Sequence, residues 1–216
     1  MSNKKEHGFS MVELAIVLAI IALIVGAVAV GKDLQRNAEY RKIANKFVGQ
    51  WAQAYNQYYE RTGVVIGDSF DSPTGVVGGK TSAAGTTMGG STLANEMIRF
   101  GIRLPQGNGR GTDETNSTKS TIYRYLDQSG IPHLLTIDFR YTSTQVNGIV
   151  GNYMYLQNVT PKLGSTTDAM IDGVVEYNGG YFRGSADWAD TSSATASKAA
   201  EEAKEIDVTA VWKMNQ

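Results

Sequence analysis

The sequence predicts an α+β protein in which one long N-terminal helix packs on a C-terminal antiparallel sheet. Residues 9–30 are almost entirely apolar, and residues 31–62 carry apolar and aromatic side chains at helical spacing. Residues 121–216 contain several segments rich in β-branched and aromatic residues, which indicates strands. Between helix and sheet, residues 63–120 are rich in Gly, Ser and Thr, which predicts a loop region with one short helix.

Residues 9–30 have the length and composition of a transmembrane helix. From Leu14 to Val30 the sequence contains no charged side chain. A helix needs about 20 apolar residues to cross the hydrocarbon core, and a single segment in lipid must be helical to satisfy its backbone hydrogen bonds. The one ionisable group near its start is Glu13, which is costly to bury in lipid. Two interpretations stay open, a carboxylate that reaches the headgroups and one that meets a positive partner inside the membrane.

A short segment, residues 1–8, precedes the span and ends in Gly8. A secretory signal has its apolar run before the cleavage site, whereas Gly8 lies before the apolar run. Cleavage between Gly8 and Phe9 therefore leaves the helix on the mature chain. It also places a new amine on Phe9, four residues from the carboxylate of Glu13.

The stretch GFSMVELAIVLAII, residues 8–21, resembles the N-terminal signature of type IV prepilins and type II secretion pseudopilins. In that family a short basic leader ends in Gly, the next residue is Phe, and Glu is the fifth mature residue. Gly8, Phe9 and Glu13 match these positions. The resemblance implies that a prepilin peptidase cleaves after Gly8 and N-methylates Phe9, and that Glu13 pairs with the Phe9 amine of a neighbouring subunit during filament assembly.

The resemblance also implies a location and further partners. It places the leader in the cytoplasm, the helix in the bacterial inner membrane as a single pass, and the rest in the periplasm or in an extracellular filament. Its expected partners are other pilin or pseudopilin subunits and the inner-membrane assembly machinery. Charge alone does not fix the orientation, because basic residues flank the span on both sides. They are Lys4 and Lys5 before it, and Lys32, Arg36, Arg41 and Lys42 after it.

Residues 31–62 are predicted to continue the span as an amphipathic helix. Apolar and aromatic side chains recur at steps of three and four and form a stripe that is typical of a face packed on a core. The stripe consists of Tyr40, Ile43, Ala44, Phe47, Val48, Trp51, Tyr55, Tyr58 and Tyr59. No proline interrupts the sequence from residue 9 to residue 61. Thr62-Gly63 predicts the end of the helix, because Gly readily adopts a left-handed cap.

Four segments predict an antiparallel sheet of about four strands: TIYRY, HLLTIDFRY, IVGNYMYLQNV and VTAVWKM. In the second of them the apolar face, which is expected to cover the stripe of the helix, alternates with polar residues and consists of Leu135, Ile137, Phe139 and Tyr141. TSTQVNG supplies the turn to the third segment, and VTAVWKM is a candidate edge strand. Short helices are expected near Leu93–Phe100 and in SATASKAAEEAKEID, which ends at Asp207.

The composition excludes several classes of function. A net charge of -1 and a pI near 6.1 argue against a nucleic-acid partner. The absence of cysteine excludes disulfides and thiolate sites. The two histidines, His7 and His133, form no catalytic set, and His133 is expected to be structural or exposed, so we expect neither catalytic residues nor an enzyme.

No cofactor or metal site is expected, with calcium as an open alternative. The resemblance raises it because major pseudopilins have an acidic calcium-binding loop in their C-terminal part. The acids in the corresponding stretch are scattered among glycines, without the spacing of a calcium loop. They are Asp168, Asp172, Glu176, Asp187 and Asp190.

The sequence thus predicts a structural subunit of a type IV filament, either a pilus or a type II secretion pseudopilus. The Gly- and Ser-rich insertion within residues 63–120 favours a minor over a major subunit, although both stay open. The alternative is a single-pass, membrane-anchored periplasmic binding domain that does not polymerise. The identity of any target of the outer domain does not follow from these residues.

Overall fold

The computed structural model describes residues 10–108, 119–146, 149–188 and 207–214. The chain divides into two units, which we call the helical unit (Met1–Ala38) and the sheet unit (Glu39–Gln216). The described part of the helical unit is helical throughout from residue 11. All strands of the described chain belong to the sheet unit.

A long helix begins at Met11 and ends at Thr62, as the unbroken absence of proline predicts. It comprises α1 (Met11–Ile43), a π-helical segment η1 (Ala44–Val48) and α2 (Gly49–Thr62). The π-helical segment was not predicted. Gly63 ends the helix in the left-handed region with φ 74°, and its N–H donates to the carbonyl oxygen of Tyr59 at 2.8 Å. This confirms the predicted stop, since only Gly adopts that conformation without strain.

The aromatic stripe of the helix packs on the sheet, as predicted. Tyr55 stacks on Phe139 with ring centroids 4.9 Å apart, and Trp51 meets the same ring edge-on at 6.4 Å. The indole N–H of Trp51 donates to the carbonyl oxygen of Ser120 at 3.1 Å. Burying each large side chain stabilises the fold by about 1.5–3 kcal/mol. The prediction was wrong for Tyr59, which is 38% exposed.

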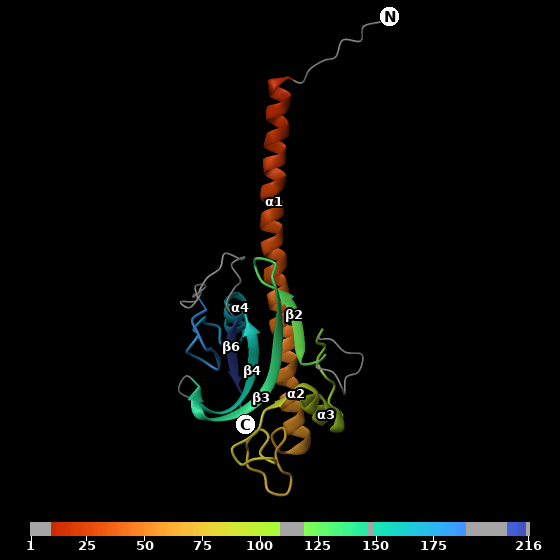
Figure 1. Cartoon of the computed structure of the whole chain (residues 1–216), viewed down its shortest axis with the longest axis vertical. Helices are drawn as coiled ribbons and strands as arrows, with labels where there is room; N and C mark the ends of the chain where they lie inside the picture. Colours follow the sequence, from red (N-terminus) through yellow and green to blue (C-terminus); the bar gives the residue numbers. More distant parts are fainter. Residues whose placement is uncertain (1–9, 109–118, 147–148, 189–206, 215–216) are drawn as a thin grey trace, which may run out of the picture. The chain divides into compact units, whose positions relative to one another are not determined.

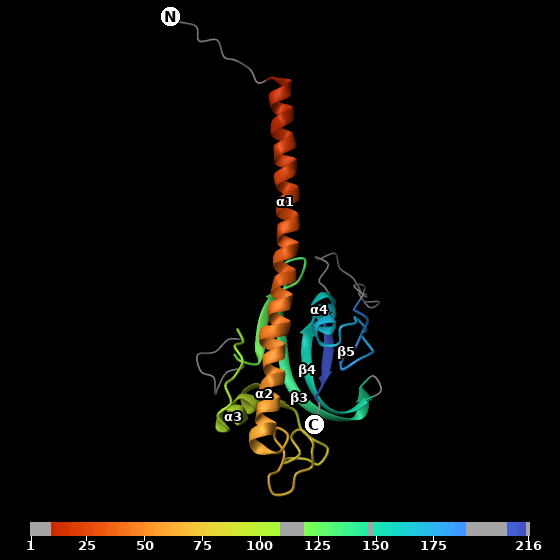
Figure 2. The same cartoon turned by 180° about the vertical axis from the view of Figure 1, so that it is seen from behind.

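The antiparallel sheet has six strands rather than about four. They are β1 (Met88–Gly89), β2 (Ile122–Leu126), β3 (Pro132–Val146), β4 (Ile149–Val159), β5 (Phe182–Gly184) and β6 (Val208–Lys213). The order is β1-β3-β4-β6-β5, with β2 also pairing with β3. In both Figure 1 and Figure 2, β3 runs next to the lower part of the long helix, and β4 lies on the other side of β3. The prediction that VTAVWKM is an edge strand was wrong, because β6 pairs with β4 on one side and β5 on the other.

The predicted alternation along β3 is confirmed by burial. Leu135, Ile137 and Phe139 are all 0% exposed and belong to the core that contains the helix stripe. The prediction of a turn at TSTQVNG was wrong for most of its length, because β3 continues to Val146; its last two residues, 147–148, lie outside the described residues. The register places Phe139 opposite Met154, so that neighbouring strands contribute to the same buried face.

Two short helices flank the sheet. The predicted helix near Leu93–Phe100 is present as α3 (Gly90–Arg99), with Leu93 and Met97 buried. A second helix, α4 (Pro161–Ile171), was not predicted. The helix predicted in SATASKAAEEAKEID falls on residues 193–206 and lies outside the described residues; Asp207, which closes that stretch, is described and precedes β6.

Residues 64–87 form turns without a helix or strand, and the buried carboxylate of Asp68 organises them. It accepts hydrogen bonds from the backbone N–H groups of Ser69, Thr74 and Gly75 at 2.8 Å each. Burial alone would raise the pKa of Asp68, but these donors and the Thr74 hydroxyl bring it below its ordinary value of 3.8. The loop region that the sequence predicts therefore has a defined internal structure here.

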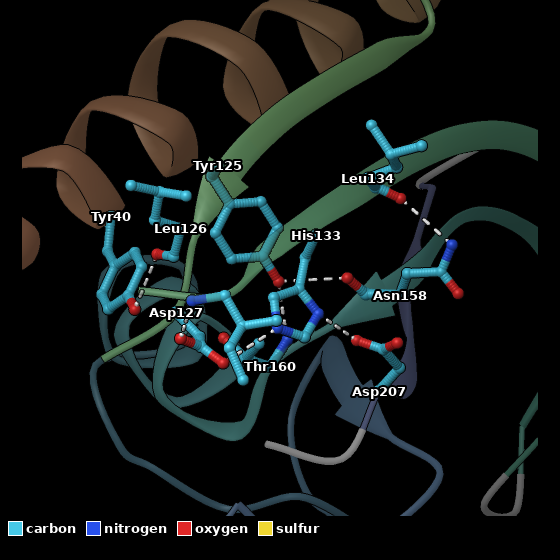
Figure 3. Close-up of polar contacts among 10 residues, drawn as sticks. Tyr40, Tyr125, Leu126, Asp127, His133, Leu134, Asn158, Thr160 and Asp207 are labelled. Carbon is cyan, nitrogen blue, oxygen red and sulfur yellow. Dashed lines mark hydrogen bonds and ion pairs between the residues drawn. The ribbon is translucent and has the colours of Figure 1, made fainter. Parts of the chain in front are cut away.

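His133 lies at the start of β3 inside a polar network (Figure 3). Its Nδ1 is 2.6 Å from Asp207 Oδ1 and its Nε2 is 3.1 Å from Asp127 Oδ2. Tyr125 stacks on the imidazole ring with centroids 5.6 Å apart. Each ring nitrogen is thus within hydrogen-bond distance of a carboxylate oxygen, so both sides of the ring are held in place. The histidine is buried and structural, one of the two outcomes that the sequence predicts for it.

Candidate processing and assembly site

The N-terminus of α1 is capped by two side chains of the helical unit. The backbone N–H of Ser10 donates to Glu13 Oε2 at 2.8 Å, and the backbone N–H of Glu13 donates to Ser10 Oγ at 3.2 Å. This reciprocal pair is a capping box, in which two N–H groups at the start of a helix are satisfied at once. The capping box forms because Ser10 directly precedes the helix and Glu13 follows it by three residues.

The capping box holds the carboxylate of Glu13 at the positive end of the helix dipole, which favours a negative charge there. An ionised carboxylate has about four acceptor sites, so one hydrogen bond from Ser10 leaves it able to accept a second donor. The two predicted processing residues, Gly8 and Phe9, lie outside the described residues. The structure therefore places Glu13 and adds Ser10 to the site.

Sequence reasoning missed Ser10, although the signal was present. The pattern Ser-x-x-Glu before an apolar run is the sequence signature of a capping box. The sequence-based expectations for Glu13 concern its charge in the membrane and its pairing with the Phe9 amine, and neither makes use of its position three residues after Ser10. The same residue therefore has a local role at the helix start as well as the assembly role that the resemblance implies.

The helix leaves a continuous apolar surface exposed over residues 11–34. Its large apolar side chains are 50% to 89% exposed in the single chain. They are Met11, Val12, Leu14, Ile16, Val17, Leu18, Ile20, Ile21, Leu23, Ile24, Val25, Val28, Val30 and Leu34. Such a surface needs lipid or other helices to cover it. Within the described residues, the helix of residues 11–62 is the one with the length and apolar composition to cross a membrane.

The five acids considered as candidate calcium ligands do not all lie together in the structure. Asp168, Asp172 and Glu176 line a small cavity of about 230 Å³, together with Val174, Gly179 and Gly180. Asp187 is not among its lining residues, and Asp190 lies outside the described residues. Within the described part of the chain, no three His, Cys, Asp or Glu side chains are grouped closely enough to hold a metal ion. We call this cavity the acidic pocket.

The carboxylate of Asp168 forms the buried floor of the acidic pocket, since the residue is 1% exposed. Its Oδ2 accepts from the backbone N–H of Glu176 at 2.7 Å and from Nε1 of Trp188 at 3.0 Å. Its Oδ1 is buried and has no hydrogen-bond partner among the described residues. Burial raises the pKa of Asp168, and the nearby carboxyl group of Asp172 adds to the rise.

Comparison with known proteins finds the N-terminal signature and nothing further. Residues 3–29 match the family model of the prokaryotic N-terminal methylation motif, which is the signal signature of type IV prepilins. No curated protein and no solved structure matches the chain. The match covers Ser10, Glu13 and the start of the apolar helix, and it includes the positions of Gly8 and Phe9. The chain thus combines the type IV prepilin signal signature with a pilin-like layout of a long apolar helix and an antiparallel sheet.

Proposed function

We propose that this protein is a structural subunit of a type IV filament, either a pilus or a secretion pseudopilus, and not an enzyme. A prepilin peptidase cleaves it between Gly8 and Phe9 and methylates the new amine. The observation that carries the proposal is the methylation motif of residues 3–29 directly before an exposed apolar helix. A helix with that surface suits both lipid, before assembly, and a bundle of identical helices, after it.

In the proposed assembly, Glu13 accepts a hydrogen bond from the Phe9 amine of a neighbouring subunit. Burying a lone carboxylate in a helix bundle is costly, and a positive partner offsets that cost. The capping box supports this role because it fixes the carboxylate at the start of the helix, close in sequence to the amine end. Other subunits and the inner-membrane assembly machinery are the proposed partners, and the sheet unit faces the periplasm or the outside of the filament.

Intact-mass and N-terminal analysis of the protein from its native membrane tests the processing step. We expect a chain that begins at Phe9 with one added methyl group. A chain that retains residues 1–8 would contradict the proposal and favour a membrane-anchored binding domain that does not polymerise.

Two substitutions separate the charge of Glu13 from its capping role. Glu13→Gln keeps a side chain that caps the helix in the same way but removes the charge, since Gln serves in a capping box as Glu does. We expect it to be processed and inserted normally but to form no filaments, measured by electron microscopy of sheared material.

Ser10→Ala is the matched control for this experiment. It removes the hydroxyl that accepts from Glu13 N–H, at a cost of about 0.5–2 kcal/mol in helix stability, but it keeps the carboxylate. We expect filaments to form with Ser10→Ala. Filaments from Glu13→Gln at the wild-type level would show that the charge is not needed and would overturn the assembly role.

A further inference from the structure

The acidic pocket is electrostatically incomplete in the single chain. Its side chains supply three carboxyl groups, from Asp168, Asp172 and Glu176, and no Lys or Arg side chain lines it among the described residues. The orphaned Oδ1 of Asp168 is an independent sign, because a buried acceptor without a donor destabilises the fold. Burial, followed by the neighbouring carboxyl group of Asp172, raises the pKa of Asp168 in the single chain, and a cation in the pocket would shift that group back toward the carboxylate.

The shape of the pocket favours an organic cation. Its volume of about 230 Å³ is larger than one metal ion requires, and its acids are not grouped closely enough to be ligands of a single metal ion within the described chain. An ammonium or guanidinium group on a side chain carries several donors and reaches separated carboxylates. Around the pocket, Val174 and Val175 are 59% and 49% exposed, and they offer apolar contact for the stem of such a side chain.

The sheet unit also presents a groove of opposite charge, which we call the basic groove. It has a volume of about 640 Å³ and lies between the polar face of the long helix, the segment 103–108 that follows α3, and Tyr123 of β2. Its charged lining residues are Lys42, Lys46 and Arg103, all of them exposed, and no acid lines it among the described residues. The groove therefore supplies the charge that the acidic pocket lacks.

The two features have different lining residues, which come from different elements of the sheet unit. The basic groove adjoins the segment after α3, whereas the acidic pocket is formed by α4 and the loop after it. Within the sheet unit, α3 and α4 lie on opposite sides of α2 in Figure 1, and the view from behind in Figure 2 keeps them apart in the same way. Two different surfaces that are complementary between copies give a head-to-tail contact, which repeats along a helical filament or closes into a ring.

We propose that the acidic pocket receives a basic side chain from the basic groove of a second copy of this chain. The contact joins neighbouring sheet units and adds a second, outer interface to the one that Glu13 provides in the helix bundle. This inference rests on the proposed function, because it needs copies of the chain side by side. Removing the positive charges from the groove, or the negative charges from the pocket, weakens the same contact.

The full-length protein allows a clean cross-linking test, because its sequence contains no cysteine. One copy carries Lys42→Cys, Lys46→Cys or Arg103→Cys, and a co-expressed copy carries Glu176→Cys. Each single substitution leaves two further charges on its own side of the contact. A disulfide between the two different copies joins these positions and gives a dimer band after mild oxidation, and expression of each single-Cys copy alone measures the dimers between identical copies. The matched control replaces the exposed acid Asp71, which lines neither the groove nor the pocket, with Cys.

We expect at least one groove position to cross-link with position 176 roughly tenfold more than with position 71, because neighbouring sites have millimolar effective concentrations. Filaments without that excess would overturn the outer contact and leave the proposed function standing. A chain that is not processed at Phe9 and forms no filaments would overturn both. A rise in melting temperature with calcium alone, lost in Asp168→Asn and without cross-links, would assign the pocket to a metal ion and also overturn the contact.

Discussion

Replacing Tyr55 with Phe is expected to stabilise the sheet unit. The ring is 1% exposed and stacks on Phe139, so the substitution keeps its packing. The hydroxyl oxygen, however, is buried without a hydrogen-bond partner among the described residues. The same burial raises the pKa of Tyr55, because a phenolate is still harder to accommodate there than the phenol.

The size of the effect follows from the desolvation of that hydroxyl. An unpaired buried polar group costs about 1–3 kcal/mol, and Phe removes the group without leaving a cavity. A gain of about 1–2 kcal/mol corresponds to a rise of about 2–8 °C in Tm for a domain of 150–250 residues. The assay is thermal unfolding of the full chain in detergent micelles, followed by tryptophan fluorescence, since Trp51 packs on the same Phe139 ring.

Tyr58→Phe is the matched control, with the same chemical change one helical turn away. Tyr58 Oη donates to Glu96 Oε1 at 3.0 Å, and this group is partly buried. Its loss is expected to lower stability by about 0.5–1.5 kcal/mol. If Tyr55→Phe lowers Tm as much as Tyr58→Phe does, the hydroxyl of Tyr55 has a partner after all and the reasoning is refuted.

Three further substitutions test the polar and packing contacts of the sheet unit. Burial tends to raise the pKa of Asp127, but hydrogen bonds from backbone N–H groups and from His133 bring it below 3.8. The ionised carboxylate therefore stabilises the fold at neutral pH, and this stabilisation is lost as the pH falls through the lowered pKa. We expect Asp127→Asn to flatten this loss of stability at acid pH, measured as urea midpoints against pH. Asp68→Ala leaves three backbone N–H groups without their acceptor, and a loss of more than about 2 kcal/mol is expected by chemical denaturation. Gly164→Ala places a methyl group against the ring of Trp188. This overpacking should lower the stability of the fold by about 1–3 kcal/mol, which is measured as a lower Tm and a shift in tryptophan emission. A wild-type pH profile, denaturation midpoint or emission spectrum, respectively, would contradict each expectation.

The long helix could be predicted from the sequence because its spacing carries the information. Trp51, Tyr55 and Tyr58 recur at steps of four and three, so they share one face of an α-helix. Tyr59 was wrongly included: it points about 100° away from Tyr58 around the helix and is 38% exposed, whereas the successive residues Phe47 and Val48 are both buried. The π-helical segment at Ala44–Val48 has no comparable signal in the pattern.

Helix α4 escaped prediction because its composition opposes it. PKLGSTTDAMI contains Gly164 and three Ser or Thr residues, which are weak helix formers. The available signal was Pro161 at the first position, where proline favours a helix start. Tertiary packing decides the outcome, since Leu163 and Thr167 are buried against the rest of the unit.

The candidate sites differ in how far apart in the sequence their residues lie, and therefore in how readily they can be predicted. The capping box of Ser10 and Glu13 depends on residues three apart and is readable from the sequence. The acidic pocket depends on α4, which places Asp168 and Asp172 one turn apart, and on the loop that returns Glu176 to them. The polar network of His133 is harder still, because its partner Asp207 is 74 residues away and arrives only when β6 takes its place in the sheet.

The position of β6 sets the order in which the sheet unit can fold. β4 and β5 both leave the ribosome before β6, yet β6 lies between them. β5 has no strand to pair with until β6 arrives, and the edge of β4 stays open to wrong pairing for as long. In the proposed topology, where α1 stays in the membrane, the sheet can close only after residue 213 has crossed. Export of the chain therefore precedes completion of its fold, and any factor that shields the edge of β4 must act on the far side of the membrane.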